Sequence, residues 1–455
     1  MATTPAPARL RRTLTLWDLI LYGVIVIQPV APMSVFGVLS QRGHGHVVTT
    51  ILIAMVAMLF TAISYGRMAR AYPSAGSAFT YVGQEINPAL GYVTGWSMVM
   101  DYMLNPMICI IWISQQAHVF APGISYGVWA TFFALVFTAL NVQGVKTSAR
   151  VNTALAAGMG VVIAIFFVAA ARYIFGVPSH DAGFFTRPFY DPQTWNTKAV
   201  LGGTSVAVLT YIGFDGISTL SEEAENPRRN ILLATVLVCV VIGILSAFQV
   251  YAAQLIWPAS EPYPNVDTAF TFVAGRAWAP LFAIVGFTLV VANFGSGMGA
   301  QLGAARLLYG MGRSSALPKS FFGAVDPKRH IPRNNVLFVG VLALAGAFVL
   351  PAIAGAATGY ELGANLLNFG ALIAFMGVNL AAFVRYYLHE PEKKLSNLLP
   401  PVLGFVICFA LWLNLSPKAL VFGAIWMVVG IAFGAWKTRG FRGNLVNFEL
   451  PPEEG

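Results

Sequence analysis

Apolar stretches of about 20 residues recur along nearly the whole chain, and they restrict the fold more than any other feature. A transmembrane helix needs about 20 predominantly apolar residues. Of the 455 residues, 57% are hydrophobic and 10% are charged, whereas an average soluble domain has about 25% charged residues. The sequence therefore predicts an all-α polytopic membrane protein that contacts the lipid bilayer, and it argues against a soluble globular domain.

Twelve spans can be placed on these stretches, and the basic residues give their orientation. The expected spans are residues 16–40, 47–69, 88–118, 124–142, 151–175, 199–221, 230–256, 278–305, 335–352, 362–386, 398–414 and 419–436. With the N-terminus inside, the 27 Lys and Arg residues fall on the cytoplasmic side except Arg42, Arg172, Arg187, Lys198, Arg276 and Lys418. The positive-inside rule then predicts an integral inner (plasma) membrane protein with both termini in the cytoplasm. It also explains the net charge of +9 without a nucleic-acid partner.

The sixth span contains residues that a simple membrane anchor does not need. Gly213, Phe214, Asp215 and Gly216 lie near the middle of residues 199–226. Each glycine weakens a helix by about 1 kcal/mol relative to alanine, and a carboxylate at membrane depth costs about 2.5 to 3.5 kcal/mol. We therefore predict a discontinuous helix, unwound at residues 213–216, with Asp215 facing a protein-lined cavity. The alternative is that Asp215 caps or pairs inside a packed bundle.

The first span has a corresponding irregularity. Its centre holds Gln28, Pro29, Ala31 and Pro32, and two prolines three residues apart remove two backbone donors and clash with the preceding turn. A break near mid-depth is expected, with a simple proline kink as the alternative. This break and the one at Asp215 lie in spans 1 and 6, five spans apart. Because five is odd, two equivalent five-helix repeats that each contain one break would have opposite orientations in the membrane. Discontinuous helices in inverted repeats point to a substrate site at the bilayer midplane.

This symmetry defines the expected organisation of the chain. The predicted units are a cytoplasmic tail, the first repeat with helices 1–5, the second repeat with helices 6–10, helices 11 and 12 outside the repeats, and a second cytoplasmic tail. They correspond to residues 1–15, 16–175, 199–386, 398–436 and 437–455.

A second acid is predicted in the third span. Asp101 lies near the middle of residues 88–118, and Asn105 follows it by one helical turn on the same face. Asp101 and Asp215 have no Lys or Arg at the same depth, so together they form a site of negative character that suits ammonium groups. A cation with two amino groups would satisfy both acids. The alternatives are that one acid stays protonated or makes structural hydrogen bonds.

Three segments carry a family resemblance. Residues 67–104 (RMARAYPSAGSAFTYVGQEINPALGYVTGWSMVMDYML), 144–152 (GVKTSARVN) and 211–231 (YIGFDGISTLSEEAENPRRNI) resemble the amino acid, polyamine and organocation permeases, and the similarity covers nearly the whole chain. The resemblance implies a LeuT-like 5+5 inverted repeat with two extra helices. It also implies secondary transport by alternating access, with substrate held between spans 1, 3, 6 and 8.

One departure from that family bears on the substrate. Amino acid members typically have a glycine-rich break in span 1, whose amides hold the substrate carboxylate. This chain has no glycine there, and the stretch resembles the putrescine importer branch. Losing a glycine nest weakens the case for an anionic group, although amides at the start of the second half-helix, from Met33 to Val35, are still able to attract one. The stretch consists of Gln28, Pro29, Val30, Ala31, Pro32, Met33 and Ser34.

These observations favour an importer of putrescine-like amines, which the family resemblance implies to be a symporter, and leave open an amino acid permease for neutral or cationic amino acids. An enzyme or a channel is not favoured, because the six histidines lie in loops or near span ends and form no catalytic or metal constellation. No cofactor or metal is expected, and the coupling ion is either Na⁺, held by Asn293 and Ser296, or H⁺ on Asp101 or Asp215. The predicted substrate-binding residues are Gln28, Pro29, Ala31, Pro32, Met33, Ser34, Asp101, Asn105, Tyr211, Gly213, Phe214 and Asp215.

Overall fold

The computed structural model describes residues 14–72, 77–144, 149–221, 224–313, 317–326, 329, 331–355, 359–438 and 440–441. Most of the two predicted tails, residues 1–15 and 437–455, lies outside these ranges. The statements that follow concern the described residues.

The described chain is helical almost throughout, and its only extended pairing is an isolated bridge between Leu14 and Ala224. The helices are α1 (Leu16–Ile27), α2 (Ala31–Arg42), α3 (Val47–Ala71), α4 (Ser77–Glu85), α5 (Pro88–Phe120), α6 (Tyr126–Val142), α7 (Ala149–Phe175), α8 (Thr197–Ala207), η1 (Val208–Thr210), η2 (Phe214–Leu220), α9 (Pro227–Ile256), α10 (Ala269–Ala277), α11 (Leu281–Arg313), α12 (Lys319–Phe322), α13 (Arg333–Ala354), α14 (Gly359–Phe383), η3 (Val384–Leu388), α15 (Leu395–Leu413) and α16 (Pro417–Lys437).

The number of membrane spans follows from length and hydropathy. Ten of the described helical segments are long and apolar enough to cross a membrane, and the bent pair α1 and α2 makes up to eleven. Helix α6 is apolar but has only 17 residues. The chain is thus an all-helical polytopic membrane protein, as predicted, and the span boundaries mostly agree within a few residues. The clearest difference is α11, which continues to Arg313 instead of ending near residue 305.

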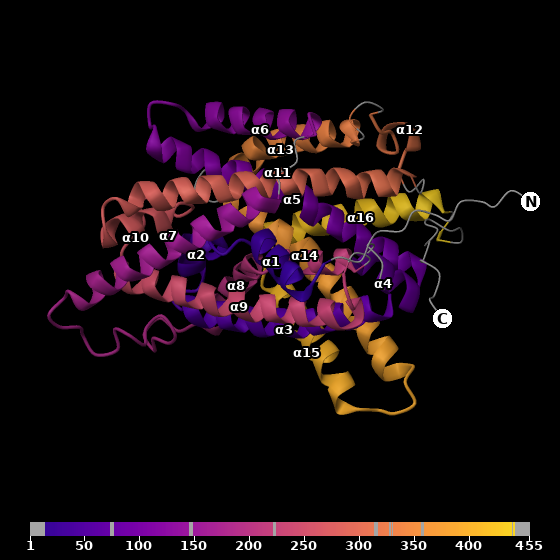
Figure 1. Ribbon diagram of the computed structural model, residues 1–455, viewed down its shortest axis with the longest axis horizontal. Helices are drawn as coiled ribbons and strands as arrows, with labels where there is room; N and C mark the ends of the chain where they lie inside the picture. The colour runs from indigo at the N-terminus through magenta and orange to yellow at the C-terminus, as the bar shows by residue number, and fades with distance from the viewer. Residues whose placement is uncertain are drawn as a thin grey trace, which may run out of the picture.

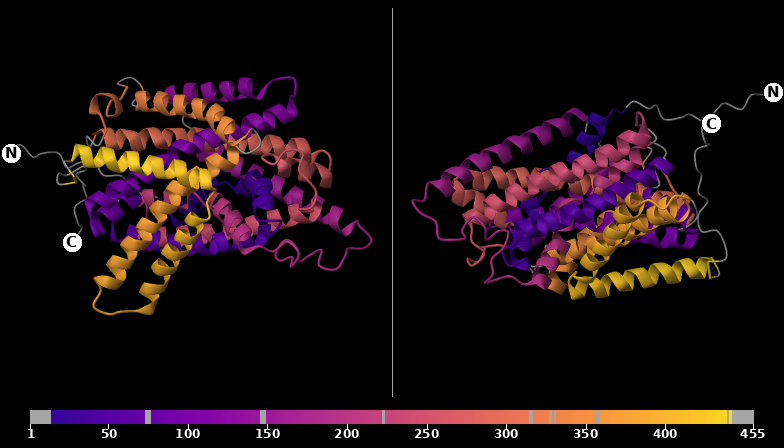
Figure 2. Two further views of the ribbon diagram at one scale, coloured as in Figure 1. Left: turned by 180° about the vertical axis from the view of Figure 1, so that it is seen from behind. Right: turned by 90° about the horizontal axis from the view of Figure 1, so that it is seen from below.

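The irregular segments lie inside the bundle. In Figure 1, α1, α2 and α8 occupy the middle, with α6 and α13 along one edge and α3 and α9 along the other. Helices α5 and α11 pack closely against each other, as do α5 and α14. Figure 2 shows the hairpin from the end of α14 to α15 projecting from one side of the bundle.

The outer faces of the peripheral helices are apolar. Val128, Phe132 and Leu135 of α6 are at least half exposed, and Val421, Ile425 and Val428 of α16 are similarly exposed. Contiguous exposed apolar residues are unfavourable in water, whereas they match the acyl chains of a bilayer. The acids Asp101 and Asp215 show the reverse pattern, because both are buried inside the bundle.

Two short helices that the sequence analysis did not predict give the fold a repeating order. Helix α4 has 9 residues and leads into α5, which has 33. Helix α10 also has 9 residues and leads into α11, which also has 33. The long helices that precede the two short ones, α3 and α9, pack extensively against each other.

Candidate substrate site

The first span is broken where the two prolines were noted. Helix α1 ends at Ile27, α2 starts at Ala31, and the two axes are bent by 47°. Between them Gln28 has a φ of +69°, a left-handed region that non-glycine residues seldom adopt. The residue before a proline is disfavoured in the helical region, which explains why the helix leaves its path there. The Pro29 carbonyl accepts a hydrogen bond of 2.9 Å from Gln249 of α9, so the broken backbone is partly satisfied from another helix.

Side chains from α5 and α11 fix the start of α2. The Gln28 amide nitrogen donates to the Ala292 carbonyl at 2.6 Å, and Asn293 donates to the Ser34 hydroxyl at 3.1 Å. The Trp112 indole donates to the Ser34 carbonyl at 3.1 Å. The first break is therefore held at a defined position against two long helices.

The amides at the start of α2 are largely used within the chain. Pro29 and Pro32 have no amide hydrogen. The Ala31 amide donates to the Gln28 carbonyl and the Met33 amide to the Val30 carbonyl, both at 3.0 Å. The amides of Ala31 and Met33 are therefore not free to converge on a carboxylate as in an anion-binding nest.

The second break lies where Gly213 was predicted to interrupt the helix. Helix α8 ends at Ala207, and after η1 and a short turn the chain continues as the 3-10 helix η2 from Phe214. Gly213 has a φ of +118°, and a Cβ atom there would lie 2.9 Å from a Val26 methyl group and 3.3 Å from Ile27 of α1. Glycine is therefore required both by the backbone conformation and by the close approach of α1. The Gly213 amide donates to the Asp215 carboxylate at 3.2 Å.

The two predicted acids come together between these breaks. Asp101 is 7% exposed and Asp215 is 5% exposed, and the two carboxylates are near enough to repel each other electrostatically. The ion pairs found among the described residues involve other acids. Helix α14 backs this site, because a Cβ atom on Gly370 would lie 3.3 Å from the Asp101 amide. Two buried negative groups without a basic partner favour a cationic ligand or a proton.

Two predicted aromatic residues, Tyr211 and Phe214, contact neighbouring helices. The Tyr211 hydroxyl donates to the Ile51 carbonyl of α3 at 2.9 Å, and Phe214 is fully buried against the rings of Tyr65 and Phe375. Both aromatics thus make packing contacts that occupy them in this structure.

The residues proposed for Na⁺ coupling have separate contacts. Asn293 donates to Ser34 of α2, as described above, whereas Ser296 forms a hydrogen bond with Cys109 of α5. The Cys109 thiol also approaches the Asn105 amide oxygen at 3.4 Å. Each of these two side chains therefore has its own hydrogen-bond partner in this structure.

Two tyrosines near the acids were not among the predicted site residues. The Tyr102 ring packs against Gly303 of α11 and lies within electrostatic reach of both Asp101 and Asp215. The Tyr65 hydroxyl is fully buried near Asp215 and has no hydrogen-bond partner in the described part of the chain.

Two further ion pairs lie toward opposite ends of the bundle. At the end predicted to face outside, Arg42 of α2 pairs with the buried Glu361 of α14, and we call this pair the outer latch. At the predicted cytoplasmic end, the Arg385 guanidinium and the Tyr72 hydroxyl donate to the Glu85 carboxylate at 2.7 and 2.6 Å, and we call this cluster the inner latch. Each latch joins the first half of the chain to the second.

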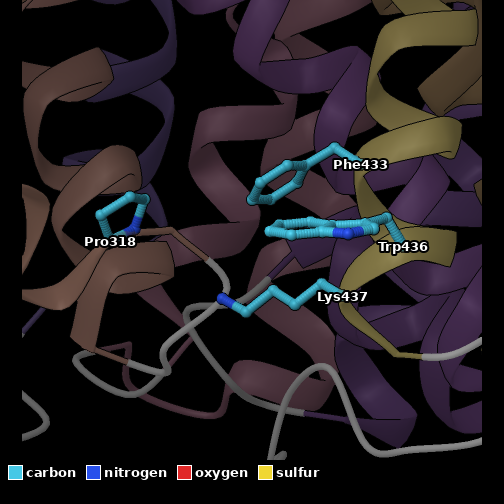
Figure 3. Close-up of a pocket in the computed structure, with 4 residues that line it drawn as sticks. All are labelled: Pro318, Phe433, Trp436 and Lys437. Carbon is cyan, nitrogen blue, oxygen red and sulfur yellow. The ribbon is translucent and has the colours of Figure 1, made fainter.

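An open pocket of about 430 Å³ lies at the end of α16 and contains none of the predicted site residues. Figure 3 shows the Trp436 ring between Phe433 and the Lys437 side chain, with Pro318 across from them. An aromatic group beside a lysine is typical of the membrane–water interface. We therefore assign the substrate site to the buried acids and not to this pocket.

Comparisons with known proteins agree with this arrangement. The family model described as amino acid permease matches residues 30–444. The chain is 34% identical to the low-affinity putrescine importer PlaP of Escherichia coli (strain K12), over 98% of both chains. It is 26% identical to the methylthioribose transporter of Bacillus subtilis (strain 168), over 92% of both. It is 24% identical to the branched-chain amino acid permease BcaP of the same bacterium, over 95% of this chain and 94% of the relative.

The match begins at residue 30, just after the end of α1, and it includes α2, the break at Gly213 and both acids. An all-helical membrane bundle with buried acids at its centre agrees with a transporter. The chain therefore belongs to the amino acid permease family of the amino acid, polyamine and organocation superfamily, and it is a membrane transporter and not an enzyme.

Proposed function

We propose that this permease imports amines with two positive charges, such as putrescine, by alternating access. The main supporting observation is the pair of buried acids, Asp101 and Asp215, which repel each other and form no ion pair with a basic residue in the described part of the chain. Two ammonium groups would neutralise both acids. The Tyr65 hydroxyl and the Tyr102 ring, both near these carboxylates, are suited to contact the amine and its alkyl chain.

The start of α2 supports an amine over an amino acid. An α-amino acid needs a site for its carboxylate, and the amides of Ala31 and Met33 are already used within the chain. The name of the Escherichia coli relative as a putrescine importer is in line with this substrate class. The second candidate, an amino acid permease, is supported by the matching family model.

We further propose twelve spans in an inverted 5+5 repeat, counting α6 and the broken pair α1 and α2 as spans. The repeated order of a 9-residue and a 33-residue helix supports this symmetry. It would relate the broken helices α1–α2 and α8–η2, which meet at Gly213. Both termini would then lie in the cytoplasm, and the protein would reside in the inner membrane.

For the coupling ion, Gln28 favours H⁺ over Na⁺. Its amide nitrogen occupies the Ala292 carbonyl of α11 at 2.6 Å, beside the break in the first span. A sodium ion in a protein is held by several oxygen ligands. Because the Gln28 amide group already donates to the Ala292 carbonyl oxygen, this oxygen is not free to bind Na⁺. We therefore assign coupling to protonation of Asp101 or Asp215.

Uptake into proteoliposomes tests the function directly. Labelled putrescine should accumulate, unlabelled cadaverine should compete, and leucine and arginine should compete weakly. Replacing external Na⁺ by choline should leave uptake unchanged, whereas a protonophore should abolish accumulation. Accumulation of labelled amino acids without competition by diamines would overturn the proposal in favour of an amino acid permease.

A further inference from the structure

Asp267 is an acid buried outside the central site. It lies in the segment that connects α9 and α10, which is not part of a membrane-spanning helix, yet it is only 2% exposed. Both of its carboxylate oxygens lack a hydrogen-bond partner in the described part of the chain. An unpaired buried carboxyl group is costly, so a purely structural role does not account for it.

Asp267 forms no ion pair in the described part of the chain. Glu361 of α14 is near enough to repel it, and Tyr126 and Tyr360 are within its electrostatic reach. Arg42 pairs with Glu361 in the outer latch. Burial, followed by the charge of Glu361, raises the pKa of Asp267 well above its usual range. Burial therefore favours the protonated form of this carboxyl group.

The segment that carries Asp267 covers the start of α2. The Trp112 indole donates to the Asp267 carbonyl at 2.7 Å and also to the Ser34 carbonyl. A Cβ atom on Gly37 would lie 2.0 Å from the Val266 carbonyl oxygen, so α2 and this segment are in direct backbone contact. The backbone carbonyl of Asp267 thus accepts a hydrogen bond from Trp112, whereas its carboxyl group forms no hydrogen bond in the described part of the chain.

We propose that Asp267, supported by Glu361, is an outer binding site for a primary ammonium group of the incoming substrate. When the outer end opens, the Asp267 carboxyl group releases its proton to external water, and the carboxylate binds the ammonium. The amine then moves inward to Asp101 and Asp215, and Asp267 takes a proton back from external water before the outer end closes. The identity of the ligand as an amine rests on the proposed function.

Asp267→Asn tests this site, because it removes the charge and keeps the shape. Glu261→Gln is the matched control, since Glu261 lies in the same segment but is exposed and pairs with Arg276. In putrescine uptake at an external pH of about 8, Asp267→Asn should raise KM about tenfold with Vmax changed less than about twofold, the loss expected for one hydrogen bond to a charged group. Glu261→Gln should change neither. The melting temperature of Asp267→Asn should equal or exceed that of the wild type.

An unchanged KM for putrescine in a folded Asp267→Asn protein would refute the proposal that Asp267 forms an outer binding site. If that variant melts earlier than the wild type, Asp267→Ser is measured in its place and judged by the same shift in KM. If the wild type does not transport putrescine, the proposed function fails, and labelled lysine, which carries a side-chain ammonium, becomes the probe. A raised KM for lysine then supports the outer site, and an unchanged KM overturns it. A wild type that transports neither amine refutes both proposals.

Discussion

The inner latch gives a quantitative prediction about access from the cytoplasm. Glu85 at the end of α4 is 3% exposed at its side chain, whereas its partner Arg385 is 40% exposed. The Arg385 guanidinium also lies 5.2 Å from the centre of the Tyr72 ring. Burial and the hydrogen bond to Glu85 raise the pKa of Tyr72 to about 12, so Tyr72 remains a neutral donor at physiological pH. Opening this end would separate the buried acid from both donors.

Replacing Arg385 with glutamine should weaken the latch measurably. Removing one partner of a fully buried pair costs about 3 to 5 kcal/mol, but exposed pairs contribute about 1 kcal/mol or less. Because Arg385 is partly exposed and Tyr72 still donates to Glu85, we expect a loss of about 1.5 kcal/mol, between these limits. A difference of about 1.4 kcal/mol corresponds to a tenfold change in an equilibrium. The population open to the cytoplasm should therefore rise about tenfold.

Cysteine labelling measures that population. Ser77 of α4 is 3% exposed and contacts Ser218 of η2 at 3.1 Å, so Ser77→Cys should react only when the inner end opens. The three native cysteines are all buried and should contribute little background. In inside-out vesicles, a membrane-impermeant methanethiosulfonate reagent should label this cysteine about tenfold faster when Arg385→Gln is added.

The matched control is Lys394→Gln, which removes an exposed ion pair with Glu392 in the neighbouring loop. It should leave the labelling rate unchanged. A labelling rate in Arg385→Gln within twofold of the parent would show that Glu85 and Arg385 do not restrain the inner end.

Three further predictions follow from single residues. Asp101→Asn and Asp215→Asn should each lower kcat/KM for putrescine by about 10- to 100-fold, with an unchanged size-exclusion profile; retained uptake would remove that acid from the site. Gly213→Ala should destabilise the fold by about 1 to 3 kcal/mol, since its φ is +118°, and an unchanged melting temperature in detergent would contradict the required conformation. Because folded Asp267 holds a proton that the unfolded chain releases above a pH of about 4, wild-type stability should fall relative to Asp267→Asn as pH rises from about 4 toward the raised pKa. Parallel melting curves against pH would refute this linkage.

The backbone breaks were the part of the site most accessible from sequence. Proline and glycine act locally, so Pro29 and Gly213 marked both interruptions without knowledge of their neighbours. Asp101 was also identifiable, because a carboxylate inside an apolar run is costly wherever the helix packs. The regular helices followed from the lengths of their apolar runs.

Residues that depend on tertiary contacts were not predictable in the same way. Glu361 immediately precedes the predicted span 362–386, and Asp267 lies between two predicted spans, where acids are normally solvated, but the chain folds over both of them. Helices α4 and α10 are too short to give a clear periodic signal. The side-chain directions of Tyr102 and Tyr211 were set by α11 and α3, and a single-span pattern contains no information on those neighbours.

Helix α14 connects the outer latch, the acid pair and the inner latch. Glu361 of the outer latch lies in its first turn, Arg385 of the inner latch lies in the π-helical turn η3, and Gly370 packs against α5 near Asp101. A π-helical turn is a common place for a helix to accommodate a functional shift. We expect movement at either end of α14 to alter the packing behind the acid pair.

Electrostatic repulsion between Asp101 and Asp215 offers a physical basis for coupling the movement of the helices to a bound cation. Asp101 and Asp215 lie within electrostatic reach of each other, and two such buried carboxylates oppose closure when both are ionised. In the transport cycle that we propose, two substrate ammonium groups remove this repulsion, as does a proton on one acid. We therefore expect the loaded or protonated carrier to close and reorient, and the empty, ionised carrier to be held open by its own charge. This difference would link the movement of α14 to the presence of a cation and so prevent an uncoupled leak.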